Sequence, residues 1–345
     1  MSFTPFQAPF NAALLGDDAT AALFSPRAEL EAMLSFEVAL AEAQAEQGLI
    51  SAAAAEAIAA ALPRFRPDMD ALREGGGRDG VVVPALVRAL REQVGEHGAS
   101  LHYGSTSQDV IDTSVMMRLR DAVALHCERL ERSVAALEAV RERHGERALT
   151  TRTRMRHALP ATLAVRLDNW LAGLAASVDG RPERFPVQLG GPDGTLAKME
   201  GRGLEVALGT AERLGLTCPA RHWHTERLPL VSVAQWFANT AGACGKIGGD
   251  VALMVQDEIA EVRVTGAGAS SAMAHKENPV RAEALVAIAR FAAVLVGGMN
   301  QAQLHEYERS GAAWALEWLL VPQLAVASGA ATARLEALLD SLDWG

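Results

Sequence analysis

A loop rich in small residues carries the side chains best suited to chemistry in this chain. Residues 265–281 read Thr-Gly-Ala-Gly-Ala-Ser-Ser-Ala-Met-Ala-His-Lys-Glu-Asn-Pro-Val-Arg. Glycine and alanine allow such a loop to close over a ligand, and Ser270 and Ser271 can exchange protons. Lys276 and Asn278 can stabilise a negative oxygen beside a helix start, which suits a reaction that forms or quenches a carbanion next to a carboxylate. The same composition is also typical of a flexible linker between helices.

A second polar cluster lies where a long helix is expected to begin. Residues 102–113 read His-Tyr-Gly-Ser-Thr-Ser-Gln-Asp-Val-Ile-Asp-Thr. Each hydroxyl or carboxylate here can simply be a helix N-cap. Four adjacent polar side chains, at 106–109, exceed what one helix start needs. We therefore expect the remaining groups, with the helix N-terminus behind them, to form an anion site for a substrate carboxylate.

A third cluster concentrates positive charge in residues 151–162. Arg152, Arg154 and Arg156 alternate in an extended or turning segment, before a helix that we expect from Pro160. The alternative is a solvated basic surface with no ligand. Further along, glycines at 190–194 indicate a tight loop. His222 and His224 have no nearby cysteine and no H-E-x-x-H helix, so we expect no metal site there.

Composition narrows the class of protein. The chain has 345 residues, half of them hydrophobic, and a net charge of −10, so we expect no broad nucleic-acid or anionic-membrane surface. Three widely spaced cysteines and an N-terminus without a basic segment predict a cytoplasmic protein without export signal or membrane anchor. The most apolar stretch, 284–297, contains Arg290 and is expected to be too short to span a membrane.

Long intervals between helix breakers predict an all-α fold. Shorter helices are expected at 26–47 and 52–62, with a turn at Gly75-Gly76-Gly77. Long helices are expected at 112–144, 231–264 and 280–320, the last with a kink at Gly297-Gly298. Gly242, Gly245, Gly248 and Gly249 suggest that the second long helix packs closely against a neighbour. Helices of this length need partners for their apolar faces, so we predict a homo-oligomer.

These elements divide the chain into three parts. Residues 1–105 form an expected N-terminal helical domain, 106–322 a central domain of long helices, and 323–345 a short helical tail. No internal repeat or low-complexity segment interrupts them.

Residues 270–279 resemble the S-S-x-M-P-x-K-x-N-P signature of the fumarase/aspartase superfamily, and the other motifs follow in that superfamily's order. The motifs at 102–113, 190–195 and 308–318 are most similar to its lactonising branch, which acts on 3-carboxy-cis,cis-muconate. The resemblance implies a homotetramer whose central bundle pools helices from four subunits and whose active sites each use three of them. The chain is shorter than typical members, which we interpret as a largely missing C-terminal domain.

The resemblance also implies residue roles. Ser270 would protonate a carbanion-like carbon, while Lys276 and Asn278 stabilise the anionic species. A tricarboxylate substrate is expected, with no cofactor and no metal. The implied substrate-binding residues are His102, Thr106, Ser107, Gln108, Arg152, Arg154, His157, Ser271, Met273 and Arg309.

Several residues depart from the pattern. Ala274 replaces a proline, Tyr307 a histidine and Arg156 a glutamine. Arg154 stands where hydrolytic-type lyases have the histidine that protonates the leaving group. Arginine does not release its proton in a protein, whereas a carboxylate that adds within its own molecule needs no such acid, so Arg154 favours lactonisation.

Two alternatives remain open at this stage. Another lyase of the superfamily, such as adenylosuccinate lyase, would have a histidine at 154 and further catalytic histidines in the N-terminal domain, for which His97 is a weak candidate. A helical oligomer without catalytic activity would also suit the lost signature proline. Retention of Ser270, Lys276 and Asn278 argues against that second alternative.

Overall fold

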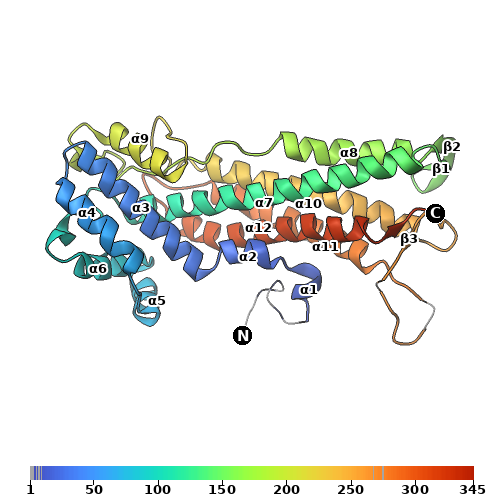
Figure 1. Cartoon of the computed structure of the whole chain (residues 1–345), viewed down its shortest axis with the longest axis horizontal. Coiled ribbons are helices and arrows are strands. Elements are labelled where there is room, and N and C mark those ends of the chain that lie inside the picture. Colours follow the sequence, from blue (N-terminus) through green and yellow to red (C-terminus); the bar gives the residue numbers. More distant parts are fainter. Residues whose placement is uncertain (1–3, 5, 7, 9, 267, 274–275) are drawn as a thin grey trace.

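The computed structural model describes residues 4, 6, 8, 10–266, 268–273 and 276–345. Long helices lie side by side along one axis, and shorter helices gather at one end (Figure 1). The helices are α1 (Ala12–Leu15), α2 (Asp18–Leu23), α3 (Pro26–Glu46), α4 (Ala52–Ala61), α5 (Met69–Asp79), α6 (Val83–Val94), α7 (Ser107–His144), α8 (Ala164–Asp179), α9 (Gly203–Leu214), α10 (Leu228–Met254), α11 (Val280–Ala302) and α12 (Ala312–Leu339). The strands are β1 (Ala148–Thr153), β2 (Arg156–Thr162), β3 (Arg263–Val264) and β4 (Leu342–Asp343).

Two hydrophobic cores support this arrangement. One lies within the long bundle of α7, α8, α10, α11 and α12, and the other within the shorter helices α3 to α6 and α9. The predicted helices at 26–47 and 52–62 are confirmed as α3 and α4. Ser25 and Ser51 each cap one of these helices by accepting a backbone N–H bond.

Helix α7 confirms the first long helix and begins five residues earlier than predicted. Its 38 residues span roughly 57 Å at about 1.5 Å per residue. Thr106 and Asp109 form a capping box at its start, so the polar residues there do act as caps. The helix therefore separates its N-terminal polar cluster from strands β1 and β2, which directly follow its C-terminus.

Close packing between α10 and α11 explains two of the four predicted interface glycines. A Cβ at Gly245 would lie 2.4 Å from the Cβ of Ala289, and one at Gly248 would lie 2.7 Å from the carbonyl oxygen of Ala282. Gly242 and Gly249 face no such close neighbour among the described residues. Helix α10 ends at Met254, not at residue 264, because the chain there turns into a loop.

The predicted helix at 280–320 is wrong, because the chain forms two helices there. Helix α11 ends at Ala302, α12 begins at Ala312, and the intervening loop replaces the kink expected at Gly297-Gly298. Ser310 accepts a hydrogen bond from the backbone N–H of Ala313, a helix-start signal in the sequence. Helix α12 continues through Pro322, so the expected tail at 323–345 is mainly its C-terminal half.

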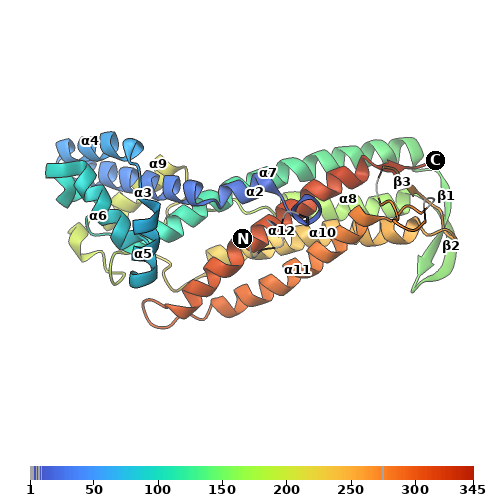
Figure 2. The ribbon, with the colours of Figure 1, turned by 90° about the horizontal axis from the view of Figure 1, so that it is seen from below.

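A β-hairpin corrects the all-α prediction. Strands β1 and β2 pair antiparallel at the end of the bundle, and a second small pair, β3 with β4, lies at the same end (Figures 1 and 2). Residues 151–157 form an extended and turning segment, as predicted, with the turn at Arg154 and Met155. Pro160 lies within β2, and the helix expected from it begins at Ala164, because the strand pairing continues to Thr162.

The glycine triplet is also helical, not a turn. Gly75, Gly76 and Gly77 lie within α5, and a Cβ at Gly75 would come within 2.4 Å of the Cβ of Ala85 on α6. The missing side chain therefore allows α5 and α6 to pack closely. The helix ends at Asp79, and the next residue, Gly80, has a φ of 75°, the left-handed conformation that glycine adopts readily.

The apolar stretch expected to be too short for a membrane belongs to a longer helix. Helix α11 has 23 residues and, by length and composition alone, is apolar enough to cross a membrane. The core helix of a soluble protein has the same properties, and α11 packs between α10 and α12 in the bundle. Its exposed surface includes Val294, which is 73% exposed.

Candidate active site

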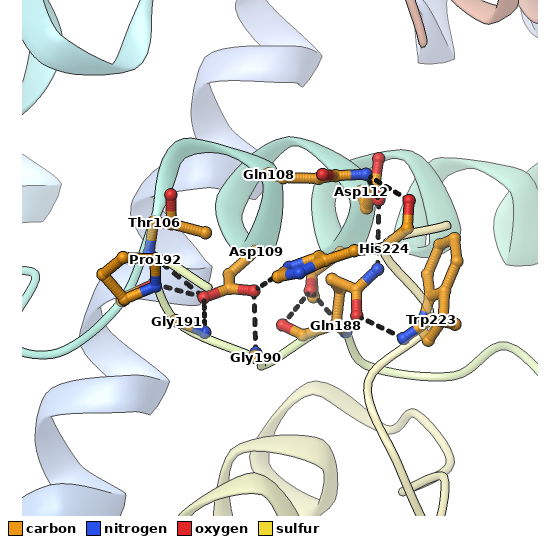
Figure 3. A network of polar contacts seen from close by, with 12 residues as sticks. Thr106, Gln108, Asp109, Asp112, Gln188, Gly190, Gly191, Pro192, Trp223 and His224 are labelled. Carbon is orange, nitrogen blue, oxygen red and sulfur yellow. Dashed lines mark hydrogen bonds and ion pairs between the residues drawn. The ribbon is translucent and has the colours of Figure 1, made fainter. Parts of the chain in front are cut away.

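A buried carboxylate organises the start of α7. Asp109 Oδ1 accepts hydrogen bonds from the backbone N–H of Gly190 at 2.9 Å and from His224 Nε2 at 2.8 Å. Its Oδ2 accepts from the backbone N–H groups of Gly191 and Thr106 at 3.0 and 3.1 Å (Figure 3). The glycine loop expected at 190–194 is thereby fixed against the helix start, and Asp109 is fully engaged in holding it.

Arg309, another predicted binding residue, also lies at the start of α7. Its guanidinium donates to Thr106 Oγ1 at 2.9 Å and to the carbonyl oxygens of Gly191 and Pro192 at 3.3 and 3.1 Å. The arginine comes from the loop between α11 and α12, so four chain segments meet here. A guanidinium beside the N-terminus of a long helix favours an anionic ligand.

His102 lies four residues before Thr106 in a strained conformation. Its φ is 61°, and its Nδ1 lies 2.6 Å from Oε1 of the buried Glu37. Burial favours the neutral imidazole, but the negative charge and hydrogen bond of Glu37 outweigh it and raise the pKa of His102. The imidazole and the carboxylate together form a hydrogen-bonded pair that fixes His102 near the helix start. Ser107, the first residue of α7, is half-buried.

Gln108 differs from the expected role. It is fully buried, and its amide nitrogen donates to Asp112 Oδ2 and to the carbonyl oxygen of His224. The residue thus positions the helix start from inside the protein and presents no surface to a ligand.

A buried ion-pair network lies directly behind Gln108. Arg227 donates to both oxygens of Asp112, at 2.7 and 3.2 Å, and to both oxygens of Glu317, at 2.8 and 2.6 Å. Burial favours the neutral acid, but Arg227 outweighs it and lowers the pKa of Asp112. Trp314 Nε1 also donates to Asp112. This network ties α7 to α10 and α12 and so fixes the frame of the site.

The basic motif lies on the β1–β2 hairpin, at the far end of α7. Arg154 and Met155 form the two-residue turn, with φ of 50° and 64°, and Arg154 is exposed at the tip. Such positive φ values cost energy for residues other than glycine and are often found at functional positions. Exposed Arg154 and His157 are therefore available to a ligand, although not one bound at Thr106 of the same chain.

Arg152 is already paired within the chain. Its Nη1 donates to Glu261 Oε1 at 2.6 Å, and Arg166 binds the other oxygen of the same carboxylate. Burial favours the neutral acid, but the two arginines outweigh it and lower the pKa of Glu261. Arg152 therefore holds the hairpin to the loop after α10, a contact that leaves less of its charge for a substrate.

The loop that carries Ser270 lies between β3 and α11 and is called the serine loop below. Its two sides bind each other. Ala269 and Glu277 pair as an isolated antiparallel β-bridge. The side-chain amide of Asn278 donates a hydrogen bond to the carbonyl oxygen of Gly268 at 3.0 Å. Ser270 Oγ accepts hydrogen bonds from the backbone N–H groups of Ala272 and Met273, at 3.3 and 3.1 Å. Asn278 thus closes the neck of the loop, while two amides point at the serine oxygen.

Other residues of this loop are open to solvent. Ser271, Met273 and Lys276 are exposed. Ala274, the departure from the signature proline, lies outside the described residues.

The predicted site residues do not meet within one chain. The hairpin and the loop between β3 and α11 lie at one end of the bundle in both views, and the loop between α11 and α12 lies toward the other end (Figures 1 and 2). Arg309 belongs to that second loop and binds Thr106 at the start of α7. The 38-residue α7, roughly 57 Å long, separates the two groups. A site that uses all three motifs therefore requires more than one copy of the chain.

Three further residues escaped the reasoning from sequence. Glu37 and Glu261 carried no motif signal, since each was one acidic residue among many along the chain. Asp109 lay inside a recognised motif, but its role in binding the glycine loop depends on contacts 81 and 82 residues away. Within the described residues, no group of His, Cys, Asp and Glu side chains is arranged to hold a metal ion, and His224 is bound to Asp109.

The profile of a lyase family matches residues 16–294. The chain is 37% identical to a 3-carboxy-cis,cis-muconate cycloisomerase of Bradyrhizobium diazoefficiens over 97% of this chain and 77% of the relative. It is 36% identical to a nitrosuccinate lyase of Streptomyces davaonensis over 92% of this chain and 71% of that protein. The chain therefore belongs to the lyase (fumarase/aspartase) family.

Solved structures agree with this assignment. The 3-carboxy-cis,cis-muconate lactonizing enzyme of Pseudomonas putida superposes with a TM-score of 0.90 at 33% identity, covering 96% of this chain and 76% of that one. A fumarate lyase from Mesorhizobium superposes with a TM-score of 0.89 at 32% identity, with the same coverage. The long-helix fold is that of the fumarase family, and the enzyme is of the lyase or cycloisomerase kind.

Proposed function

We propose that this enzyme is a cycloisomerase that lactonises 3-carboxy-cis,cis-muconate in the breakdown of aromatic compounds in the cytoplasm. The observation that carries the proposal is the resemblance along the chain to four cycloisomerases, at 34–38% identity over 88–97% of this chain. Arg154 supports it, because a guanidinium cannot protonate a leaving group and lactonisation needs no such step.

The proposed reaction begins with an intramolecular addition. One substrate carboxylate adds to the conjugated double bond, and the electron pair moves to form an enolate-like aci-carboxylate. Ser270 then donates its proton to carbon, and the serine alkoxide recovers a proton from solvent. The two amides that already bind Ser270 Oγ would stabilise the alkoxide, as the cationic Lys276 would from the same loop.

Arg309, Thr106 and His102 would bind one part of the tricarboxylate. Arg154 and His157 of the hairpin, and Ser271 and Met273 of the serine loop, would contact the remainder. Because nucleophile and acceptor belong to one molecule, correct placement contributes much of the rate enhancement.

The proposed assembly is a homotetramer in which neighbouring copies supply the missing motifs. An antiparallel neighbour would bring its hairpin end beside the α7 start of the first copy. The exposed apolar residues on the long helices, Val294 and Leu319 among them, offer surface for such packing.

Elimination from a substituted succinate is the second candidate. It is favoured by the 36% identity to the nitrosuccinate lyase, which is close to that of the cycloisomerases. Ultraviolet assays with 3-carboxy-cis,cis-muconate and nitrosuccinate in parallel distinguish the two. Turnover of the muconate alone supports the proposal, and turnover of nitrosuccinate alone refutes it.

A further inference from the structure

A cavity of about 280 Å³ lies beside the N-terminal half of α7, and Ile111 and Asp112 from the end of the 102–113 motif form part of its wall. It is enclosed by α7, the junction of α5 and α6, and parts of α10 and α12. Its volume is near the lower end for small-molecule sites, which run from roughly 300 to 1,000 Å³. The walls are mostly apolar and include Phe24, Val81, Val115, Trp223, Leu230, Trp318 and Val321.

Three of the charged residues in the wall satisfy one another. Arg227 is bound on both sides by Asp112 and Glu317, as described above, and its guanidinium stacks on Trp223 at 4.6 Å. These groups give the cavity a rigid polar edge. Their donors are already used, so they leave little attraction for a ligand.

Arg118 is different, because its guanidinium has only weak partners: it lies over the Phe24 ring at 5.4 Å and forms a long ion pair with Glu29. Its side chain is 8% exposed, and Nε donates to the carbonyl oxygen of Ser114 at 3.1 Å. One terminal nitrogen lies 3.8 Å from the half-exposed carboxylate of Glu29, beyond hydrogen-bond distance. Within the described part of the chain, neither terminal nitrogen donates a hydrogen bond. Burial lowers the pKa of Arg118, and Glu29 compensates for it incompletely.

We propose that this cavity is a binding site for a small aromatic monocarboxylate. The terminal nitrogens of Arg118 would hold the carboxylate in a bidentate pair, and the aromatic and aliphatic walls would cover the ring. A bound carboxylate would supply hydrogen-bond acceptors to the two terminal nitrogens of Arg118. The site is distinct from the anion site at Thr106 and Arg309.

Benzoate is the probe, with benzamide as its neutral control of similar shape. Binding is measured by calorimetry and by the fluorescence of Trp223 and Trp318, which line the cavity. We expect saturable binding of one benzoate per chain and at least tenfold weaker binding of benzamide. Absence of saturable binding, or equal binding of both compounds, would overturn the proposal.

Variants locate the bound anion. Arg118→Gln should weaken benzoate binding roughly tenfold or more, because a charged hydrogen-bond donor is lost. Glu29→Gln removes a competing negative charge at the rim and should tighten binding roughly two- to fivefold. Val81→Trp should abolish binding by filling the cavity, and it serves as a second test if Arg118→Gln does not fold.

Two controls separate this site from the others. Arg27→Gln removes an exposed arginine of α3 and should leave benzoate affinity unchanged. Arg309→Gln removes the anion site at the α7 start and should likewise leave it unchanged. If Arg309→Gln abolishes benzoate binding while Arg118→Gln does not, the carboxylate binds at the candidate active site and the proposal is refuted.

Discussion

The guanidinium of Arg309 donates a 2.9 Å hydrogen bond to the hydroxyl of Thr106, although 203 residues separate them in the chain. Thr106 is the N-cap of α7, and Arg309 belongs to the loop between α11 and α12. The contact places a fixed cation next to the positive end of a helix dipole. It defines the part of the candidate active site that one chain can build alone.

Replacing Arg309 by lysine should lower kcat/KM by roughly 10–100-fold, because one ammonium cannot reach Thr106 and both carbonyl oxygens with the same fixed geometry. The fold should remain intact. Steady-state kinetics and circular dichroism test this, with Arg27→Lys on α3 as the control. Unchanged kinetics for Arg309→Lys would show that the arginine plays no part in substrate binding.

Two inactive variants should complement each other when mixed. Ser270→Ala and Arg309→Gln remove residues from opposite ends of the bundle. In a tetramer that combines motifs from different copies, some sites receive both intact residues, so a co-expressed mixture should recover roughly a quarter of wild-type activity. The mixed species is purified with two different affinity tags and assayed directly.

The control for this experiment is a wild-type chain co-expressed with each single variant, which should retain partial activity. Light scattering should give four times the 36.5 kDa chain mass. Mixed tetramers with no activity would show that shared sites are not formed from these residues.

Much of the helical fold could be predicted from the sequence, because breakers and apolar periodicity act locally. The helices α3, α4 and α7 follow from serine or threonine caps and long intervals without glycine or proline. The errors occurred where tertiary contacts override composition. Gly75 remains helical because α6 packs against it, and Pro160 is in a strand because β1 pairs with β2.

The sequence allowed the residues of the candidate site to be predicted, but not their positions relative to one another. Motif spacing indicated Thr106, Arg154 and Ser270, yet no local pattern reveals that α7 separates them. Buried partners were equally invisible, since Glu37 looks like any other acidic residue of a helix until it is found beside His102. Long-range contacts determine both features, and a single sequence contains no direct signal for them.

The pair of His102 and Glu37 should make the free energy of unfolding decrease as pH rises. The pKa of His102 is raised in the folded protein, so its contribution is fully present below the unfolded value of about 6.5 and is lost as pH rises through the folded value. Urea unfolding of wild type and Glu37→Gln from pH 6 to 9 tests this. Their difference in unfolding free energy should shrink with rising pH, and a constant difference would contradict the assignment.

His126 should instead make the free energy of unfolding decrease as pH falls. It is fully buried, with Nε2 2.9 Å from Thr20 Oγ1 and beside the Asp17–Arg129 ion pair. Burial, and then Arg129, lower its pKa to about 3. The neutral form therefore stabilises the fold above pH 6.5, and this stabilisation is lost as pH falls toward 3.

When the pH is lowered from 7.5 to 5, protonation of His126 in the unfolded state should by itself reduce the free energy of unfolding by about 2 kcal/mol. Urea unfolding of wild type and His126→Gln at the two pH values measures this contribution. The variant should lose less stability than wild type over the interval. An equal loss in both proteins would show that His126 does not titrate as its burial predicts.

The proposal of lactonisation by Ser270 is tested most directly by the ultraviolet absorbance of 3-carboxy-cis,cis-muconate. Wild-type enzyme should consume the conjugated diene and form the lactone, identified by mass and NMR spectra. Ser270→Ala should be slower by roughly three orders of magnitude or more, whereas Ser271→Ala should lose much less. No decay with wild-type enzyme, or near-normal decay with Ser270→Ala, would contradict the account.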